Sequence, residues 1–312
     1  MHHSILVSKY TAFKHLISSY IVNTLSTYTY SDKISCIEGK KITLSKGRDN
    51  NKVLYISGMA LWLAKSHNQD PMEIASAIVS QLLETCGGVF IIQIVPPGWI
   101  YLELTHPLLA TWLQSLAVGS LEKAEEQASR RDSEPPLGIE RKREQGRKEN
   151  LIQNSRCQIS NPERLFAMQY VHARCCSLVW LAHREGLIKL REPLPDTSPA
   201  LGNIIFTEQI PWLDCDEKLR LNHPDESHLI TKLVQVVDDL VCSDDGSVNW
   251  ERAGLNLSQA FENFWSKCRI WGEVKISSPE LAKARLGLVM VTQSVLRFLL
   301  VEKLKVVALL EL

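Results

Sequence analysis

The apolar residues of the first third of the chain change from helical to strand-like spacing. Apolar and aromatic side chains recur every three or four positions over residues 6–25, which predicts an opening amphipathic helix. Residues 34–44 contain two short β-prone runs around a glycine and predict a hairpin. Residues 89–95 and 99–104 are apolar runs on either side of Pro96-Pro97-Gly98, so they predict two further strands that meet at a turn.

A helix is predicted between these strand regions, from residue 71 to the glycine pair at 87–88. Its start combines an N-cap acceptor, a proline and an early carboxylate: Asp70, Pro71 and Glu73. Its apolar side chains repeat at four-residue intervals: Ile74, Ile78 and Leu82. Helix and strands together predict a small α/β domain over residues 1–120.

Charged residues replace the apolar pattern over residues 121–155. This segment holds eight basic and eight acidic side chains, so it is predicted to be a flexible linker. Its basic block, residues 141–148, includes Arg141, Lys142 and Arg143, which are candidate contacts to a phosphate backbone. A solvated tether is the alternative, and the mixed charge favours it.

The remainder of the chain has helical patterning. Four amphipathic segments are predicted to form an all-α helical bundle over residues 156–312; they are residues 161–185, 228–241, 257–271 and 279–300. The predicted fold class is therefore α+β, with a small N-terminal α/β domain joined by a charged linker to a C-terminal helical bundle.

Composition narrows the functional classes. Lys and Arg number 35, as do Asp and Glu, so no overall field attracts nucleic acid or anionic lipid, and any such binding must use local patches. The eight cysteines include no Cys-x-x-Cys pair, and Lys and His interrupt the early apolar residues. We therefore expect a cytoplasmic protein with reduced thiols and neither metal nor cofactor. Arg297, Glu302, Lys303 and Lys305 interrupt the C-terminal apolar run, so no membrane association is expected.

One predicted helix carries an unusual polar cluster within two turns. Residues 168–180 read MQYVHARCCSLVW and bring together Gln169, Tyr170, His172 and Arg174. Tyr170 and Arg174 are four residues apart and share a face, so they could stack on an unpaired base and hold a phosphate. Gln169 and His172 could instead satisfy buried polar groups between helices, and for these two that reading is favoured.

These residues resemble a known family. QYVHARCCSLVWLA, AFENFWSKCRI and ARLGLVMVTQSVL are similar to the helical anticodon-binding (DALR) domain of arginyl-tRNA synthetases, whose first helix typically reads Gln-Tyr-Ala-His-Ala-Arg. LAKSHNQDPMEIASAIV and VPPGWIYLEL resemble the additional N-terminal domain of the same enzymes. The resemblance covers most of the chain outside residues 121–155. It implies a tRNA-binding protein and makes Gln169, Tyr170, His172 and Arg174 candidate tRNA contacts.

The resemblance does not extend to the catalytic domain of these enzymes. Arginyl-tRNA synthetases carry a class I Rossmann domain between these two regions, with a His-x-Gly-His type signature and a Lys-Met-Ser-Lys-Ser type loop for ATP. Neither motif occurs here. The linker cannot hold such a domain, because a single βαβ unit already takes about 30 residues.

The N-terminal region also departs from the family at a tRNA-contacting strand. Where the family usually has Gly-Asp-Tyr-Gln-x-Asn, this sequence reads VLYISG, with Leu54, Ile56 and Gly58 in place of Asp, Gln and Asn. Tyr55 keeps the tyrosine position, and Tyr101 replaces the usual Asn after the Pro-Gly turn. Apolar side chains cannot hydrogen-bond base edges, so recognition of the tRNA D-loop is not expected to survive in full.

Other candidate sites have simpler explanations. Phe264 and Trp265 are expected in the core rather than as a base platform. His172 beside Cys175 or Cys176 is not expected to form a nucleophilic pair, because nothing in the sequence lowers the thiol pKa. The acidic pairs at 238–239 and 244–245 lack the spacing of a calcium loop.

Three functional hypotheses follow. The first is a non-catalytic tRNA-binding adaptor that presents a tRNA, with an arginine tRNA as the candidate, to a tRNA-modifying or aminoacylating enzyme. DNA is not expected as a ligand. The second is a protein-interaction scaffold that has lost RNA binding. The third is an accessory subunit of arginyl-tRNA aminoacylation, which would need a separate catalytic chain.

Overall fold

The computed structural model describes residues 12–32, 44–47, 52–118, 161–189, 209–242 and 248–311. The predicted linker, including Arg141, Lys142 and Arg143, lies outside the described residues, as does most of the hairpin predicted at 34–44. The boundary between two domains within residues 121–155 therefore stays a prediction.

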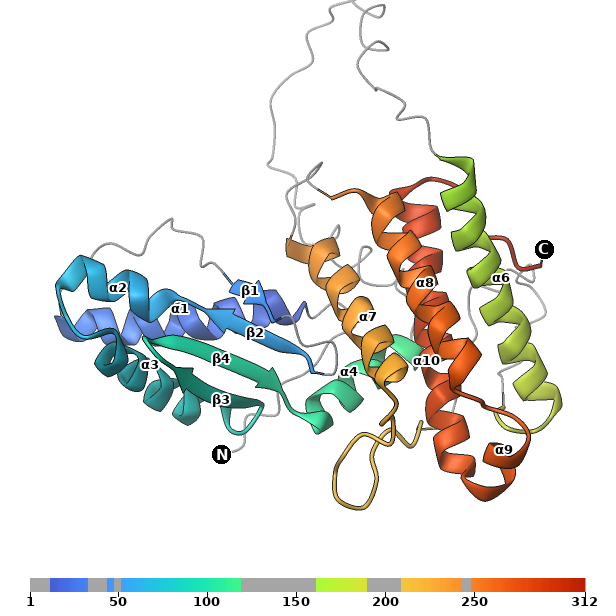
Figure 1. Ribbon diagram of the computed structural model, residues 1–312, viewed down its shortest axis with the longest axis horizontal. Helices are drawn as coiled ribbons and strands as arrows, with labels where there is room; N and C mark the ends of the chain where they lie inside the picture. The colour runs from blue at the N-terminus through green and yellow to red at the C-terminus, as the bar shows by residue number, and fades with distance from the viewer. Residues whose placement is uncertain are drawn as a thin grey trace, which may run out of the picture.

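The N-terminal part combines helices with a four-stranded antiparallel sheet in the order β1-β2-β4-β3. Its elements are α1 (Phe13–Asp32), β1 (Leu44–Lys46), β2 (Leu54–Ser57), α2 (Met59–His67), α3 (Pro71–Cys86), β3 (Phe90–Val95), β4 (Trp99–Leu104) and α4 (His106–Val118). Helix α3 packs on β3 and β4, and α1 packs on α3. In Figure 1 this part lies beside the C-terminal helices, with α4 between them.

The start, the end and the buried apolar stripe predicted for helix α3 are confirmed. The carboxylate of Asp70 accepts a hydrogen bond from the Met72 backbone N–H at 3.0 Å, and Pro71 occupies the first turn. The helix ends at Gly87, whose φ of 52° is left-handed and suits glycine. The predicted stripe of Ile74, Ile78 and Leu82 is buried.

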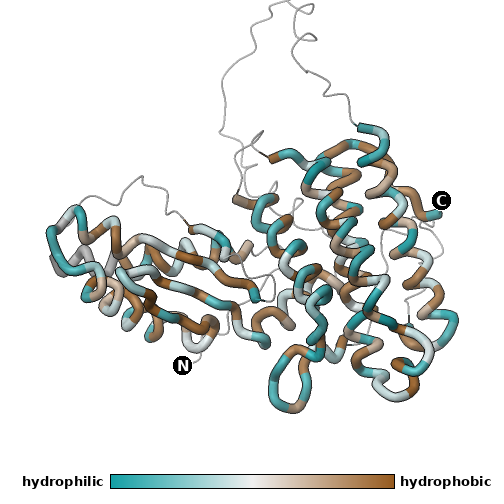
Figure 2. The backbone as a smooth tube through the Cα atoms, in the orientation of Figure 1, coloured by the Kyte–Doolittle hydropathy of each residue, from teal (hydrophilic) through white to brown (hydrophobic). Residues whose placement is uncertain are grey.

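The predicted strands at 89–95 and 99–104 are also confirmed, as the antiparallel pair β3 and β4 with Val95 opposite Trp99. Side chains alternate along β4: Ile100, Leu102 and Leu104 are buried, whereas Trp99 is exposed and Tyr101 partly so. Figure 2 shows that β3 and β4 are largely hydrophobic, whereas the loop leading into α7 is largely hydrophilic. The sheet therefore has one covered face and one more open face.

The C-terminal part is a helical bundle, as predicted. It contains α6 (Pro162–Arg184), α7 (Pro224–Cys242), α8 (Trp250–Lys267), a short α9 (Glu273–Ser277) and α10 (Pro279–Phe298), which continues into the π-helical turn η1 (Leu299–Lys303). Helix α8 begins seven residues before its predicted start, because Asn249 caps it by accepting a hydrogen bond from the Arg252 N–H at 2.8 Å.

Helix α10 is the central helix of the bundle and contacts α6, α7, α8 and α4. The segment Pro279–Lys303 is long and apolar enough to cross a membrane by length and composition, yet 78% of its apolar window is buried inside the structure. The core helix of a soluble protein passes the same test, so this segment is only weak support for a membrane span.

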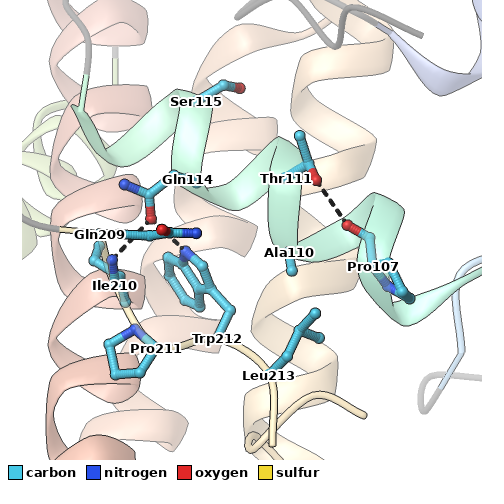
Figure 3. A pocket seen from close by; sticks show the side chains of 10 residues that line it. All are labelled: Pro107, Ala110, Thr111, Gln114, Ser115, Gln209, Ile210, Pro211, Trp212 and Leu213. Carbon is cyan, nitrogen blue, oxygen red and sulfur yellow. Dashed lines mark hydrogen bonds between the residues drawn. The ribbon is translucent and has the colours of Figure 1, made fainter. Parts of the chain in front are cut away.

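The sheet-containing part and the bundle contact each other directly. Helix α4 packs on α10, and the Gln114 side chain of α4 accepts hydrogen bonds from the Ile210 N–H at 3.1 Å and the Trp212 indole N–H at 2.9 Å. Figure 3 shows these bonds in a depression of about 800 Å³ between α4 and residues 209–213. One amide oxygen thus satisfies two donors and fixes the segment before α7 against α4.

Candidate nucleic-acid interface

Helix α6 carries the motif that the sequence singled out. Its start is fixed by Asn161, whose side chain accepts a hydrogen bond from the Glu163 N–H at 3.0 Å, and by Pro162 in the first turn. Its inner faces pack on α8 and α10. The outer face is therefore the surface available to a ligand.

Exposed residues of α6 form a stripe along this outer face, which we call the α6 stripe. It consists of Phe166, Tyr170, Arg174, Ser177 and Trp180. Its aromatic side chains are 58%, 46% and 42% exposed at residues 166, 170 and 180. Spacings of three and four residues place these side chains above one another over about 21 Å, at 1.5 Å per residue.

Two aromatic rings of the stripe stack on each other. The ring centroids of Phe166 and Tyr170 are 6.4 Å apart, and the ring planes differ by 23°. Neither ring is covered by the bundle, so the pair leaves aromatic surface in solvent. Aromatic platforms of this kind stack on unpaired bases, and each stacked base contributes about 1–3 kcal/mol.

A cation is held beside this pair. The Arg174 guanidinium lies 5.3 Å from the centre of the Trp265 ring. The Trp265 and Trp271 ring centroids are 5.9 Å apart, and the two ring planes meet at 73°. The indole restricts the guanidinium without neutralising it, because a cation–π contact leaves the positive charge in place. Arg174 thus presents a placed charge one helical turn from Tyr170.

The other two polar residues of the motif, the half-buried Gln169 and the buried His172, hold the C-terminal segment. The Gln169 side-chain amide donates to the Val307 carbonyl oxygen at 2.9 Å, and Nδ1 of His172 lies 2.7 Å from the Leu309 carbonyl oxygen. Since that oxygen can only accept, Nδ1 carries the proton, and Nε2 is left to accept from the Gln293 amide at 3.2 Å. Figure 1 shows the C-terminal residues beside α6.

The setting of His172 favours its neutral form. The residue is 0% exposed, and burial lowers the pKa of the imidazole; the hydrogen bond to Leu309 opposes this shift, and Arg297 acts in the same direction as burial. A fully buried ring cannot touch a ligand at the surface, so the geometry favours the architectural role for His172. The predicted site therefore divides: Tyr170 and Arg174 face solvent, whereas Gln169 and His172 fasten residues 304–311 across α6.

The neighbouring thiols are not activated. Burial raises the pKa of Cys175 well above its usual value and that of Cys176 to about 11. Cys176 Sγ lies 4.0 Å from His172, whose Nδ1 proton is already donated to Leu309. The pair has the character of packed core side chains. Among the residues that the structure describes, no group of three or more His, Cys, Asp or Glu side chains could hold a metal ion.

Strand β2, where the sequence departs from the arginyl-tRNA synthetase pattern, directs its side chains to the two faces of the sheet. Tyr55 is buried and donates its hydroxyl proton to the Asp238 carboxylate of α7, so it joins the two parts of the chain. Leu54 and Ile56 belong to the opposite face of the sheet, where Ile56 pairs with Tyr101. The Trp99 ring lies so close to Gly58 that a Cβ there would come within 2.8 Å of it. Aromatic and apolar side chains thus lie on this open face together with Gln93 and with Glu103, which forms an ion pair with Lys52 at 3.0 Å.

Two aromatic residues of the α6 stripe were not predicted from the sequence. Phe166 lies one turn before Tyr170, and Trp180 lies ten residues after it. The four-residue spacing from Tyr170 to Phe166 was a usable signal, but exposure could not be known because the same spacing also fits a buried stripe. Phe264 is in the core as expected, whereas Trp265 is partly exposed under Arg174.

Two curated proteins match part of the chain. The arginine–tRNA ligase of Synechococcus sp. (strain JA-3-3Ab) is 28% identical over 131 residues, which are 41% of this chain and 19% of that protein. The arginine–tRNA ligase of Ruminiclostridium cellulolyticum is 28% identical over 140 residues, or 44% of this chain and 20% of that protein. Each match thus spans about a fifth of the relative's length. No protein-family model and no solved structure matches the chain. These partial matches indicate a protein related to arginine–tRNA ligases.

Proposed function

We propose that this protein is a non-catalytic tRNA-binding adaptor that holds the anticodon region of a tRNA on the α6 stripe. The observation that carries this proposal is the solvent-facing Phe166–Tyr170 stack beside a restrained Arg174. Loop nucleotides bind through bases splayed onto aromatic or guanidinium planes. The resemblance of this helix to the DALR anticodon-binding domain and the two arginine–tRNA ligase relatives add support.

The charge balance of the C-terminal part is consistent with tRNA recognition by a few individual side chains rather than by a broad positive surface. Residues 156–312 hold eighteen basic and twenty acidic side chains, so their net charge is about −2 and no broad positive field surrounds the helices. Binding of this type depends on stacking and on individual phosphate contacts, so the number of those contacts sets how steeply its affinity falls with salt. An arginine tRNA is the ligand that the relatives suggest, with a second enzyme acting on the bound tRNA.

The test compares stacking variants with a matched control. Fluorescence anisotropy with labelled total tRNA would be measured for Phe166→Ala, Tyr170→Ala and Leu83→Ala. Loss of a stacked ring should weaken binding roughly 5- to 150-fold, from about 1–3 kcal/mol per base. Leu83 is an exposed apolar residue on α3, and its removal should leave the affinity unchanged. Absence of tRNA binding at micromolar protein and low salt, with a genuine arginyl-tRNA synthetase binding alongside, would overturn the proposal.

The salt dependence of tRNA binding by an Arg174→Ala variant provides a separate test. Removing one phosphate contact should reduce the slope of log affinity against log salt by about 0.7–0.9. A matched Ser177→Ala variant changes the next exposed position of the α6 stripe without changing charge, and its slope should equal that of the unmodified protein. An unchanged slope in Arg174→Ala would exclude Arg174 as a phosphate contact.

The scaffold hypothesis rests on one specific observation, the aromatic and apolar residues on the open face of the sheet. Trp99 lies over Gly58 and Tyr101 lies beside Ile56, where related enzymes use polar side chains. Such a surface suits protein contact better than base recognition. A nuclease-resistant complex that Trp99→Ala weakens and Tyr170→Ala does not would favour this second function.

A further inference from the structure

A cavity of about 330 Å³ lies where the sheet-containing part meets α7, away from the α6 stripe. Its charged and polar lining comes from both parts of the chain and includes Lys14, Lys46, Tyr55, Lys232, Asp238 and Asp239. Lys46 reaches across this joint, because its Nζ donates a 2.6 Å hydrogen bond to the backbone carbonyl of Thr231 on α7. The Lys46 amine is therefore held in place beside open space.

Among the residues that the structure describes, no carboxylate forms an ion pair with Lys46, although Asp238 and Asp239 act on it through space. One oxygen of Asp238 accepts from the Tyr55 hydroxyl, and the other accepts from the Lys14 backbone N–H at 3.1 Å. Asp239 interacts with Lys46 through space and is itself partly buried. Lys232 and His228 also lie within range of Lys46 on α7.

This setting disfavours the ammonium form. Burial lowers the pKa of Lys46 to about 8; Lys232 acts in the same direction, and Asp238 and Asp239 oppose it. At pH 8 about half of such amines are neutral, compared with roughly one in 300 for an ordinary lysine. A neutral amine keeps two N–H groups and a lone pair, so it can donate to Thr231 and still act as a nucleophile.

We propose that Lys46 is a modification site that accepts an acyl group from a small acyl thioester entering the cavity between β1 and α7. The nitrogen lone pair attacks the thioester carbonyl, a C–N bond forms, and the C–S bond breaks. The thiolate leaves and is protonated by the proton released from nitrogen. The products are an Nζ-acyl amide and a free thiol, with no change in oxidation state.

Acylation changes the joint between β1 and α7. It removes the positive charge that Lys46 places near Asp238 and Asp239 and adds a small group to the cavity. The buried carboxylates then keep only the Tyr55 hydroxyl, the backbone of residue 14 and the remaining lysines as counterparts. We expect the modified joint to open more often, which would let acyl donors control how firmly the sheet-containing part is held on α7.

The first measurement follows acylation of the intact protein by acetyl-coenzyme A, read out by peptide mass mapping at several pH values. Lys46 should react on the order of tenfold faster at pH 8 than the exposed Lys65 and Lys189, after allowing for lower nucleophilicity at lower basicity. Its rate should level off above pH 8, and the advantage should vanish in denaturant. Equal rates in the folded protein, or a Lys46 rate still rising steeply above pH 9, would overturn the proposal.

Two sets of variants test the reactivity of Lys46 and the opening of the joint between β1 and α7. Lys232→Gln removes a repelling charge from Lys46, so the midpoint of its rate profile should move to higher pH, whereas Lys65→Gln should leave it unchanged. Lys46→Gln, which resembles the acylated side chain, should increase hydrogen exchange around Thr231, and Lys46→Arg should not. An unmoved midpoint in Lys232→Gln contradicts the reactivity, and unchanged exchange in Lys46→Gln contradicts the loosening of the joint.

Discussion

Replacing His172 with Ala should destabilise the bundle without directly weakening RNA binding. The imidazole is fully buried and makes two hydrogen bonds, one to the Leu309 carbonyl and one from the Gln293 amide. Its removal leaves the half-buried Leu309 carbonyl without this donor and the buried Gln293 amide with only Cys176 Sγ at 3.8 Å, and it opens a cavity between α6 and α10. Each unsatisfied buried group costs about 1–3 kcal/mol.

The sum of these effects is a loss of about 2–5 kcal/mol in the free energy of unfolding. For a protein of this size each kcal/mol corresponds to about 2–4 °C, so the melting temperature should fall by roughly 4–20 °C. Thermal melting by circular dichroism measures this shift, with Ser177→Ala as the exposed control on the same helix. Affinity per folded molecule, titrated well below the transition, should stay within about twofold.

The stability that His172 contributes should decrease as the pH falls. Since the pKa of His172 is lowered in the folded state, the unfolded chain binds the proton more readily. The stability that His172 contributes is therefore present above the unfolded pKa of about 6.5 and is lost as pH falls below it. His172→Gln should show a smaller drop in melting temperature between pH 7.5 and 5.5. A His172→Ala variant that melts within a degree of the parent would refute this reasoning.

Three further predictions use different parts of the chain. Leu82→Asp should abolish folding of the sheet-containing part, because it puts a charge on a 0% exposed position, whereas the adjacent Leu83→Asp, at a 53% exposed position, should melt almost normally. Deleting residues 126–150 should leave the thermal transition in place, since segments of mixed charge make few packed contacts. Tyr55→Phe should lower the melting temperature by a few degrees, because the buried Asp238 carboxylate loses a donor; an unchanged value would show that water replaces it.

Local signals in the sequence were sufficient for several elements. Helix α3 and the β3–β4 pair were predicted because their caps, glycines and apolar periods act over only a few residues. The bundle was predicted for the same reason, since each long helix has its own apolar stripe. Helices α2 and α4 were not anticipated from the sequence.

The sequence also determined which residue types gather on α6. A tyrosine and an arginine four residues apart share a face whatever the surrounding fold, because 3.6 residues complete each turn. The resemblance to arginyl-tRNA synthetases likewise needed only the order of residues, and the two partial matches to arginine–tRNA ligases agree with it.

Only the tertiary structure decided which members of that cluster face solvent. Gln169 and His172 are held by Val307 and Leu309, which lie more than 130 residues away in the chain, and only His172 is fully buried. The joint at Lys46 likewise depends on Thr231, 185 residues away. Helical periodicity fixes which side chains point the same way, but burial and pKa depend on what the rest of the chain packs against that face, and local sequence does not contain this information.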